Sequence, residues 1–163
     1  MDIRTVGKEI KVRRKAIGLT QERLAKLAHL SRQTVQKLEA GSIEDLGFQR
    51  VSSLLTVLGL SFDKLSLTAR NKKRGLWMAA KTSSISYRDD LTESMLEHAL
   101  ATGQAPEGFE AHIGHFLDEA PIGMVVMAVE EAAQLEHKMP TEIWSNVAAL
   151  ARKYSDDRKE LWV

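Results

Sequence analysis

Apolar residues recur every three or four positions along almost the whole chain, and this spacing predicts an all-α protein. In the first 69 residues we expect five short helices. Their inward-facing residues are, in order, Ile3, Val6, Ile10 and Ile17; Leu24 and Ala28; Val35 and Leu38; Phe48, Val51, Leu54, Leu55 and Leu58; and those of a short segment at 61–67. Gly18 and Gly59 follow two of these segments, where a left-handed residue ends many helices. We expect Arg13, Arg14 and Lys15 on the outer side of the first helix.

Beyond residue 90 the helical spacing returns, and prolines mark the starts of three of the four helices expected there. These helices begin near Leu91, Pro106, Pro121 and Pro140. The helix from Pro121 is apolar on every side over 122–129, which favours the centre of a bundle over a face shared with another chain. Residues 83–88 alternate briefly, which predicts a short strand or extended arm. Trp162 has few apolar neighbours in the sequence, so we expect it to serve in docking.

The segment from Thr20 to Gly41 contains two short amphipathic helices with almost nothing between them. Thr20 and Ser31 each precede a helix with a hydroxyl that can accept from its free amides, so both are expected N-caps. The second helix carries polar residues opposite its apolar face: Arg32, Gln33, Thr34, Gln36 and Lys37. A helix with this polar face, packed on a partner helix, has the geometry required to enter the major groove of DNA.

Residues 3–67 resemble the helix-turn-helix domain of the phage Cro and repressor type, often called the Xre family. The resemblance is carried by LTQERLAKLA followed by LSRQTVQKLEAG. It implies a five-helix bundle in which the second motif helix reads base edges.

The resemblance also implies roles for individual residues. Base contacts in the family come from the start and outer face of the second motif helix, which matches Arg32, Gln33 and Lys37 here, with Thr34 and Gln36 as further candidates. The Gln that opens the first motif helix contacts the phosphate backbone in the family, and it matches Gln21. We add Ser31 and Ser42 as candidate phosphate contacts.

The sequence departs from the family pattern at two places. The turn between the motif helices usually carries Gly, but His29 stands there; histidine tolerates a positive φ, so the turn can survive. The loop after the second motif helix, 42–47, carries Glu44 and Asp45, where many relatives have basic residues. Both carboxylates would be repelled by phosphate, which puts backbone contacts from this loop in doubt.

The charge distribution divides the chain into two modules. The 163 residues have a net charge of only +1. However, 1–81 contains 17 basic and 7 acidic residues, a net charge of +10, whereas 82–163 contains 6 and 15, a net charge of −9. We therefore expect a DNA-binding domain at 1–69, a basic linker at 70–81 and an acidic helical domain for protein interaction and dimerisation at 82–163.

The sequence gives little support for catalysis, cofactor binding or metal binding. There is no cysteine, no nucleophile elbow, no phosphate-binding Gly loop and no zinc-binding HExxH motif, so we expect neither an enzyme nor a bound cofactor. His112 and His115, together with His98 if the fold brings it near them, are interpreted as helix-surface residues and not as a metal site. With no long apolar run and no signal-like start, we expect a soluble, cytoplasmic protein without a membrane segment.

The expected function is sequence-specific repression by a homodimer bound to double-stranded operator DNA. The run EAGSIEDLGFQRVSSLL is similar to antitoxins of toxin–antitoxin operons, which implies autoregulation through one domain and neutralisation of a toxin through the other. An acidic second domain suits a basic toxin partner. Two alternatives remain open: a repressor whose second domain senses a small molecule, and an enzyme that uses the helix-turn-helix for targeting.

Overall fold

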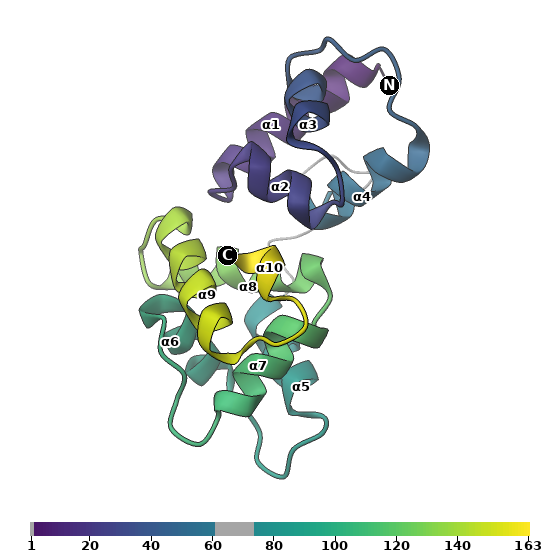
Figure 1. Cartoon of the computed structure of the whole chain (residues 1–163). Helices are drawn as coiled ribbons and strands as arrows, with labels where there is room; N and C mark the ends of the chain where they lie inside the picture. Colours follow the sequence, from purple (N-terminus) through teal and green to yellow (C-terminus); the bar gives the residue numbers. More distant parts are fainter. Residues whose placement is uncertain (1, 61–73) are drawn as a thin grey trace. The chain divides into compact units, whose positions relative to one another are not determined.

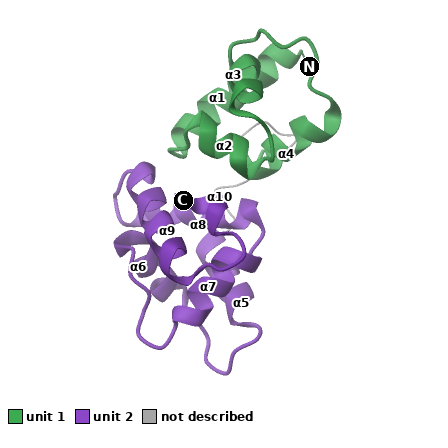
Figure 2. Ribbon diagram, viewed as in Figure 1, with its two compact units in different colours: residues 1–73 green, residues 74–163 purple. Residues whose placement is uncertain are grey.

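A computed structural model describes residues 2–60 and 74–163, and every described residue lies in a helix or a connecting loop. The expectation of an all-α protein is therefore confirmed for these residues. The chain divides into two compact units, residues 1–73 and 74–163, shown in separate colours in Figure 2. Figure 1 labels the helices used below.

Unit 1 contains four described helices: α1 (Ile3–Ala16), α2 (Gln21–Leu27), α3 (Arg32–Glu39) and α4 (Phe48–Leu58). α1 packs against α3 and α4, and α2 packs against α3. Their shared core is made of side chains with no exposed surface, among them Ile10, Leu24, Val35, Leu38, Leu54 and Leu58. Gly18 and Gly59 take positive φ values of 69° and 64° after α1 and α4, as expected. The expected fifth helix, 61–67, lies outside the described residues.

Two expectations for unit 1 are wrong. Arg13 and Arg14 are not on an outer face, because only 4% and 8% of their surfaces are exposed. The Arg13 Nε donates to the Leu58 carbonyl at 3.1 Å and so satisfies an acceptor at the end of α4. Phe48 does not face the core: it is 72% exposed, and the buried stripe of α4 begins at Val51.

Unit 2 contains six helices: α5 (Gly75–Ser84), α6 (Glu93–Thr102), α7 (Glu110–Glu119), α8 (Ile122–Leu135), α9 (Pro140–Tyr154) and α10 (Lys159–Trp162). α8 contacts α5, α6 and α9, while α7 contacts α5 and α9. Val125, Val126, Ala128 and Val129 of α8 are buried within this unit. The expectation that α8 packs in the bundle is confirmed for these residues, whereas Ile122, Met124 and Met127 are only half-buried.

At the start of unit 2, the structure differs from both the expected linker at 70–81 and the expected strand at 83–88. Residues 75–81 belong to α5, because Leu76, Ala79 and Ala80 supply a buried face that outweighs the basic character of the segment. Gly75 permits this packing, since a Cβ there would lie 2.8 Å from the Met127 backbone carbon. The alternation at 83–88 is no strand: Ser83 and Ser84 end α5, and their hydroxyls donate to carbonyls four residues earlier at 2.7 and 2.8 Å.

The prolines mark helix starts in two of three cases. Pro121 directly precedes α8, and Pro140 is the first residue of α9. Pro106 instead lies in a turn that closes with the Phe109 amide donating to its carbonyl at 3.0 Å. α7 therefore begins only at Glu110.

The C-terminal segment is packed into the rest of unit 2 and is not exposed for docking. Trp162 has no exposed surface, its indole Nε1 donates to the Leu117 carbonyl at 3.1 Å, and its ring stacks on Trp144. Asp118 holds the turn before α10 by accepting from the Ser155 hydroxyl and from backbone amides, including that of Arg158. Burial alone would raise the pKa of Asp118, but these hydrogen bonds outweigh it and lower the pKa. Residue spacing within the C-terminal segment could not predict the burial of Trp162, because its ring packs against α7 and α9, which are separate elements earlier in the chain.

The expectation that His112 lies on a helix surface is also wrong. It is 5% exposed and stacks on Tyr87 at 4.0 Å between ring centroids, and its Nε2 lies 2.7 Å from the Asp89 carbonyl oxygen. It is therefore a packing residue that attaches the 85–92 loop to α7, and not a residue of the helix surface.

Trp162→Ala should lower the free energy of unfolding of unit 2 by about 3–5 kcal/mol, because it leaves a large cavity and an unpaired carbonyl. All three tryptophans lie in unit 2, so fluorescence of the remaining two during urea unfolding follows this unit alone. Val163→Ala, at a partly exposed position, should change stability by no more than about 0.5 kcal/mol. Equal effects of the two substitutions would contradict the structural role of Trp162.

Candidate nucleic-acid interface

The hairpin of α2 and α3 is defined by hydroxyl caps at both helix starts. The Thr20 hydroxyl accepts from the Arg23 amide at 3.1 Å, and the Ser31 hydroxyl accepts from the Thr34 amide at 3.0 Å. Both predicted N-caps are confirmed. Because each cap satisfies an amide that the helix leaves free, the two short helices begin at defined residues.

The turn between α2 and α3 has its left-handed residue at His29, with φ of 55°. The Leu30 amide donates to the Ala25 carbonyl at 2.8 Å, and the His29 amide donates to the Lys26 carbonyl at 3.1 Å. These two bonds form a Schellman motif, the helix ending that usually requires glycine. The same pair of bonds ends α3, with Gly41 at the left-handed position. Histidine thus completes the turn without glycine.

α3 has two chemically different faces. Val35, Leu38 and Glu39 are buried, whereas the opposite face is open to solvent. The candidate base-contacting residues all lie on α3: Arg32, Gln33, Gln36 and Lys37 are exposed, and Thr34 is half-buried. The structure thus brings four long hydrogen-bonding side chains together on one accessible surface.

A buried ion pair fixes the position of α3. The Arg14 guanidinium of α1 donates to both carboxylate oxygens of Glu39 at 2.5 and 2.9 Å, and it also donates to the Leu19 carbonyl at 2.7 Å. Gln21 of α2 donates to Glu39 at 2.8 Å. Three helices therefore meet at one carboxylate whose side chain is only 1% exposed.

Sequence reasoning missed this network, although a signal was present. Arg14 lies four residues after Ile10 and three before Ile17, so it occupies the buried stripe of α1. Glu39 lies four residues after Val35 on the inner face of α3. A charged residue on each of two buried faces is expected only where the charges are paired.

The pKa of Glu39 follows from this environment. Burial alone would raise the pKa, but hydrogen bonds from Arg14 and Gln21, together with the charges of Arg14 and Lys11, outweigh it and lower the pKa. The carboxylate is consequently charged near neutral pH and holds Arg14 in place.

The three candidate phosphate contacts already hold structural roles. Gln21 is half-buried and uses its amide nitrogen on Glu39. The Ser31 hydroxyl caps α3, and the Ser42 hydroxyl donates to the Lys37 carbonyl at 3.2 Å after α3 ends. Ser31 and Ser42 are both exposed, so each side chain can meet a ligand while it retains its capping bond.

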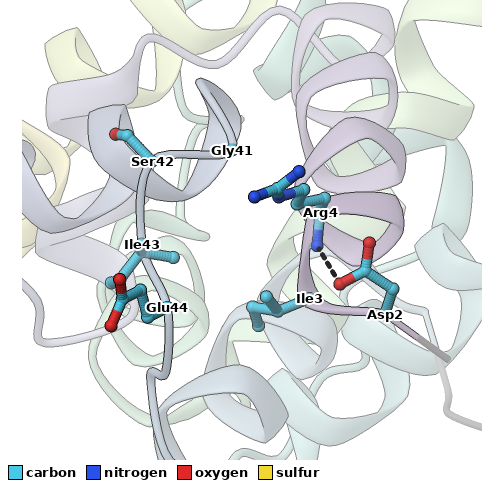
Figure 3. Close-up of a pocket in the computed structure, with 7 residues that line it drawn as sticks. All are labelled: Asp2, Ile3, Arg4, Gly41, Ser42, Ile43 and Glu44. Atoms are coloured by element: carbon cyan, nitrogen blue, oxygen red, sulfur yellow. Dashed lines mark hydrogen bonds between the residues drawn. The ribbon is translucent and has the colours of Figure 1, made fainter.

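The loop after α3 borders an open pocket of about 530 Å³. Figure 3 shows residues 41–44 on one side and Asp2, Ile3 and Arg4 at the start of α1 on the other. Arg4 points across toward Gly41, while the Ser42 hydroxyl points away. With Asp2 and Glu44 beside a single Arg4, the lining has no excess of positive charge. This pocket is therefore poorly suited to phosphate.

Within residues 2–60 and 74–163, no group of three or more His, Asp and Glu side chains is placed to hold a metal ion. No helix in those ranges combines the length and apolarity required to span a membrane.

Glu39→Gln should lower the free energy of unfolding of unit 1 by roughly 1–3 kcal/mol at pH 7, since it leaves Arg14 buried without its counter-charge. Because the pKa is lowered by folding, the wild-type carboxylate contributes fully above its unfolded pKa of about 4.3 and loses this contribution as acid protonates the folded form. The stability gap should therefore narrow as the pH falls from 6 to 3.

This gap can be measured by far-UV circular dichroism in urea, with tryptophan fluorescence identifying the transition of unit 2. Glu9→Gln, an exposed carboxylate on the same α1, provides the matched control and should change stability by no more than about 0.5 kcal/mol. A gap for Glu39→Gln that stays constant down to pH 3 would contradict the assigned pKa.

Comparison with known proteins agrees with this geometry. A helix-turn-helix family model, HTH_3, matches residues 10–65, a range that contains all of α2, α3 and α4. No curated protein and no solved structure matches the chain. Residues 10–65 therefore form a helix-turn-helix domain of the Cro and repressor (Xre) type, and the protein is a DNA-binding transcription regulator.

Proposed function

We propose that the protein is a homodimeric, sequence-specific repressor that acts as the antitoxin of a toxin–antitoxin operon. Unit 1 binds the operator of its own operon, and unit 2 binds and neutralises the toxin. The observation that carries the DNA-binding half of this proposal is the exposed polar face of α3, set against a buried face that is fixed by Glu39.

The side chains of α3 supply the chemistry for reading base pairs. Arg32 can donate two hydrogen bonds to the O6 and N7 atoms of guanine, and Gln33 can pair with the N6 and N7 atoms of adenine. Lys37, one turn further along, reaches guanine or phosphate. A rigid α3 matters here, because each contact requires the helix to keep one depth and one angle in the groove.

Gln21 connects the expected contact with the DNA phosphate backbone to the Glu39 network that holds α3. Its amide nitrogen is bound to Glu39, which leaves its carbonyl oxygen and its second N–H for other partners. A phosphate that meets Gln21 would therefore be placed relative to α3 through the shared carboxylate. Such a contact positions the protein on DNA without reading sequence.

The charge of unit 2 supports a protein partner. Residues 74–163 contain 8 basic and 15 acidic residues, a net charge of −7, so phosphate repels this unit. Toxins that act on nucleic acids need basic surfaces, and an acidic unit complements such a surface while it competes with the nucleic acid.

Arg32→Ala, Gln33→Ala and Lys37→Ala should each weaken operator binding by about 1–3 kcal/mol and broaden the preferred sequence. The operator is first selected from a random DNA library, and affinities are then measured by fluorescence anisotropy at two salt concentrations. Gln21→Ala should weaken binding to all sequences alike. Lys8→Ala, an exposed residue on α1, should retain the sequence preference.

The assignment of α3 fails if Arg32→Ala and Gln33→Ala retain both affinity and preference. A binding constant that does not depend on salt would instead exclude unit 1 as a phosphate-contacting surface.

The proposed neutralisation of a toxin can be tested by measuring cell growth. A protein that co-purifies with the native full-length chain should arrest growth when it is expressed alone, and co-expression of this chain should restore growth. Arg32→Ala/Gln33→Ala should still restore growth, because the two activities reside in different units. If no co-purifying protein is toxic, the antitoxin assignment is wrong, whereas the DNA-binding assignment is unaffected.

A further inference from the structure

Three lysines of α1 form a line along the exposed side of this helix, here called the lysine stripe: Lys8, Lys11 and Lys15. They share one face, because residues three or four positions apart in an α-helix are neighbours. All three are exposed, and none of them is held in an ion pair within residues 2–60 and 74–163. Like charges at this spacing repel each other, so an anion that lies across the stripe relieves a repulsion that the free protein retains.

The lysine stripe borders the contact between α1 and α3. Lys11 follows Gly7 by one turn and precedes Arg14 by one turn, and both of these residues touch α3. A Cβ on Gly7 would overlap the Leu38 carbonyl oxygen. Arg14 binds Glu39, and Lys11 is close enough to that carboxyl for its charge to help lower the pKa. The stripe is therefore continuous with the framework that holds α3.

The acidic side chains near α1 do not balance the charge of the stripe. Glu9 is the only carboxylate of α1, and it points to a different side of the helix, because adjacent residues do not share a face. Asp2 and Glu44 lie beside Arg4 and offset its charge, so the excess of positive charge begins one turn later. Over the length of the lysine stripe, α1 thus presents positive charge to solvent.

A phosphate backbone fits the stripe in length and in charge. At about 1.5 Å per residue, Lys8 and Lys15 are roughly 10 Å apart along the helix. One strand of B-DNA carries a phosphate for about every 3.4 Å of its axis, so up to about three phosphates can lie opposite the stripe. Lysine binds phosphate as a point charge on a flexible stem and does not read bases in doing so. DNA is also the ligand of the helix-turn-helix domain to which α1 is joined.

We propose that the lysine stripe binds the phosphate backbone of DNA that flanks the base pairs read by α3. The inference rests on the proposed binding of an operator, and it adds a contact region outside the groove that α3 enters. Each phosphate that the stripe neutralises releases condensed counterions. The stripe consequently raises affinity for every DNA sequence and lengthens the segment that one copy of unit 1 covers.

The first test removes the three charges from the full-length protein. Lys8→Gln/Lys11→Gln/Lys15→Gln should weaken binding by at least about tenfold at roughly 50 mM salt, and should lower the slope of log K against log salt by about 2–3. The loss should be equal on the selected operator and on a random duplex of the same length. Fluorescence anisotropy over a series of salt concentrations measures both quantities, and circular dichroism melting verifies that the variant is folded.

The matched control removes the same number of positive charges from unit 2. Arg152, Lys153 and Lys159 are exposed there. Their simultaneous replacement by Gln should leave the salt slope almost unchanged, because phosphate contacts and not the net charge of the chain determine that slope.

The second test locates the contact on the DNA. Operator duplexes are prepared in which the phosphates on either side of the base pairs read by α3 are replaced by neutral methylphosphonates. Wild-type protein should bind these duplexes at least about tenfold more weakly than the unmodified operator. The triple lysine variant should lose less than about twofold, because a contact that is already absent cannot be removed again.

Outcomes for the stripe and for the operator are separable. The proposed role of the stripe is overturned if the triple variant keeps the salt slope of the unit 2 control, or if the neutral flanks weaken this variant as much as the wild type. Tighter DNA binding by the variant would assign the lysines to an acidic protein surface and would also overturn the proposal. If the wild type prefers no sequence, the proposed operator binding fails, while the salt slope on random DNA still tests the stripe.

Discussion

The bidentate pair between Arg14 and Glu39 is the constraint on which the DNA-binding surface depends. It joins α1 to α3 where neither helix is long enough to be stable alone, and Gln21 brings α2 to the same carboxylate. Gly7 adds to this constraint, because a Cβ there would overlap the Leu38 carbonyl, so α1 and α3 touch through their backbones. A buried pair of this kind adds little net stability compared with an apolar contact. Its value lies in fixing one geometry for the exposed face of α3.

The sequence predicted the parts of the fold that depend on local chemistry. Thr20 and Ser31 act as caps through atoms three residues away, and the positive φ of His29 depends on bonds within its own turn. The elements that depended on distant partners were mispredicted. Arg14 is buried because Glu39 meets it from 25 residues away, and Trp162 is buried because α7 and α9 enclose its ring. Spacing along one segment holds no information about such partners.

The candidate site shows the same division between local and distant causes. The exposed face of α3 followed from its spacing, since the residues opposite Val35 and Leu38 must face away from the core. The hydrogen bond from Gln21 to Glu39 could not be predicted, because a single polar residue at a helix start gives no sign of its acceptor. α5 was hidden for a related reason: its basic and small residues resemble a linker until α8 supplies a surface on which Leu76 and Ala79 are buried.

The distribution of prolines has a consequence for the kinetics of folding. All three prolines, at 106, 121 and 140, lie in unit 2, and unit 1 contains none. In an unfolded chain roughly 10–30% of each X–Pro bond is cis, and its return to trans takes tens of seconds or longer. The described peptide bonds are all trans, so these three bonds must return to trans before unit 2 is complete. Unit 1 has no such delay, and after synthesis or unfolding the DNA-binding surface can therefore form while the acidic unit is still folding.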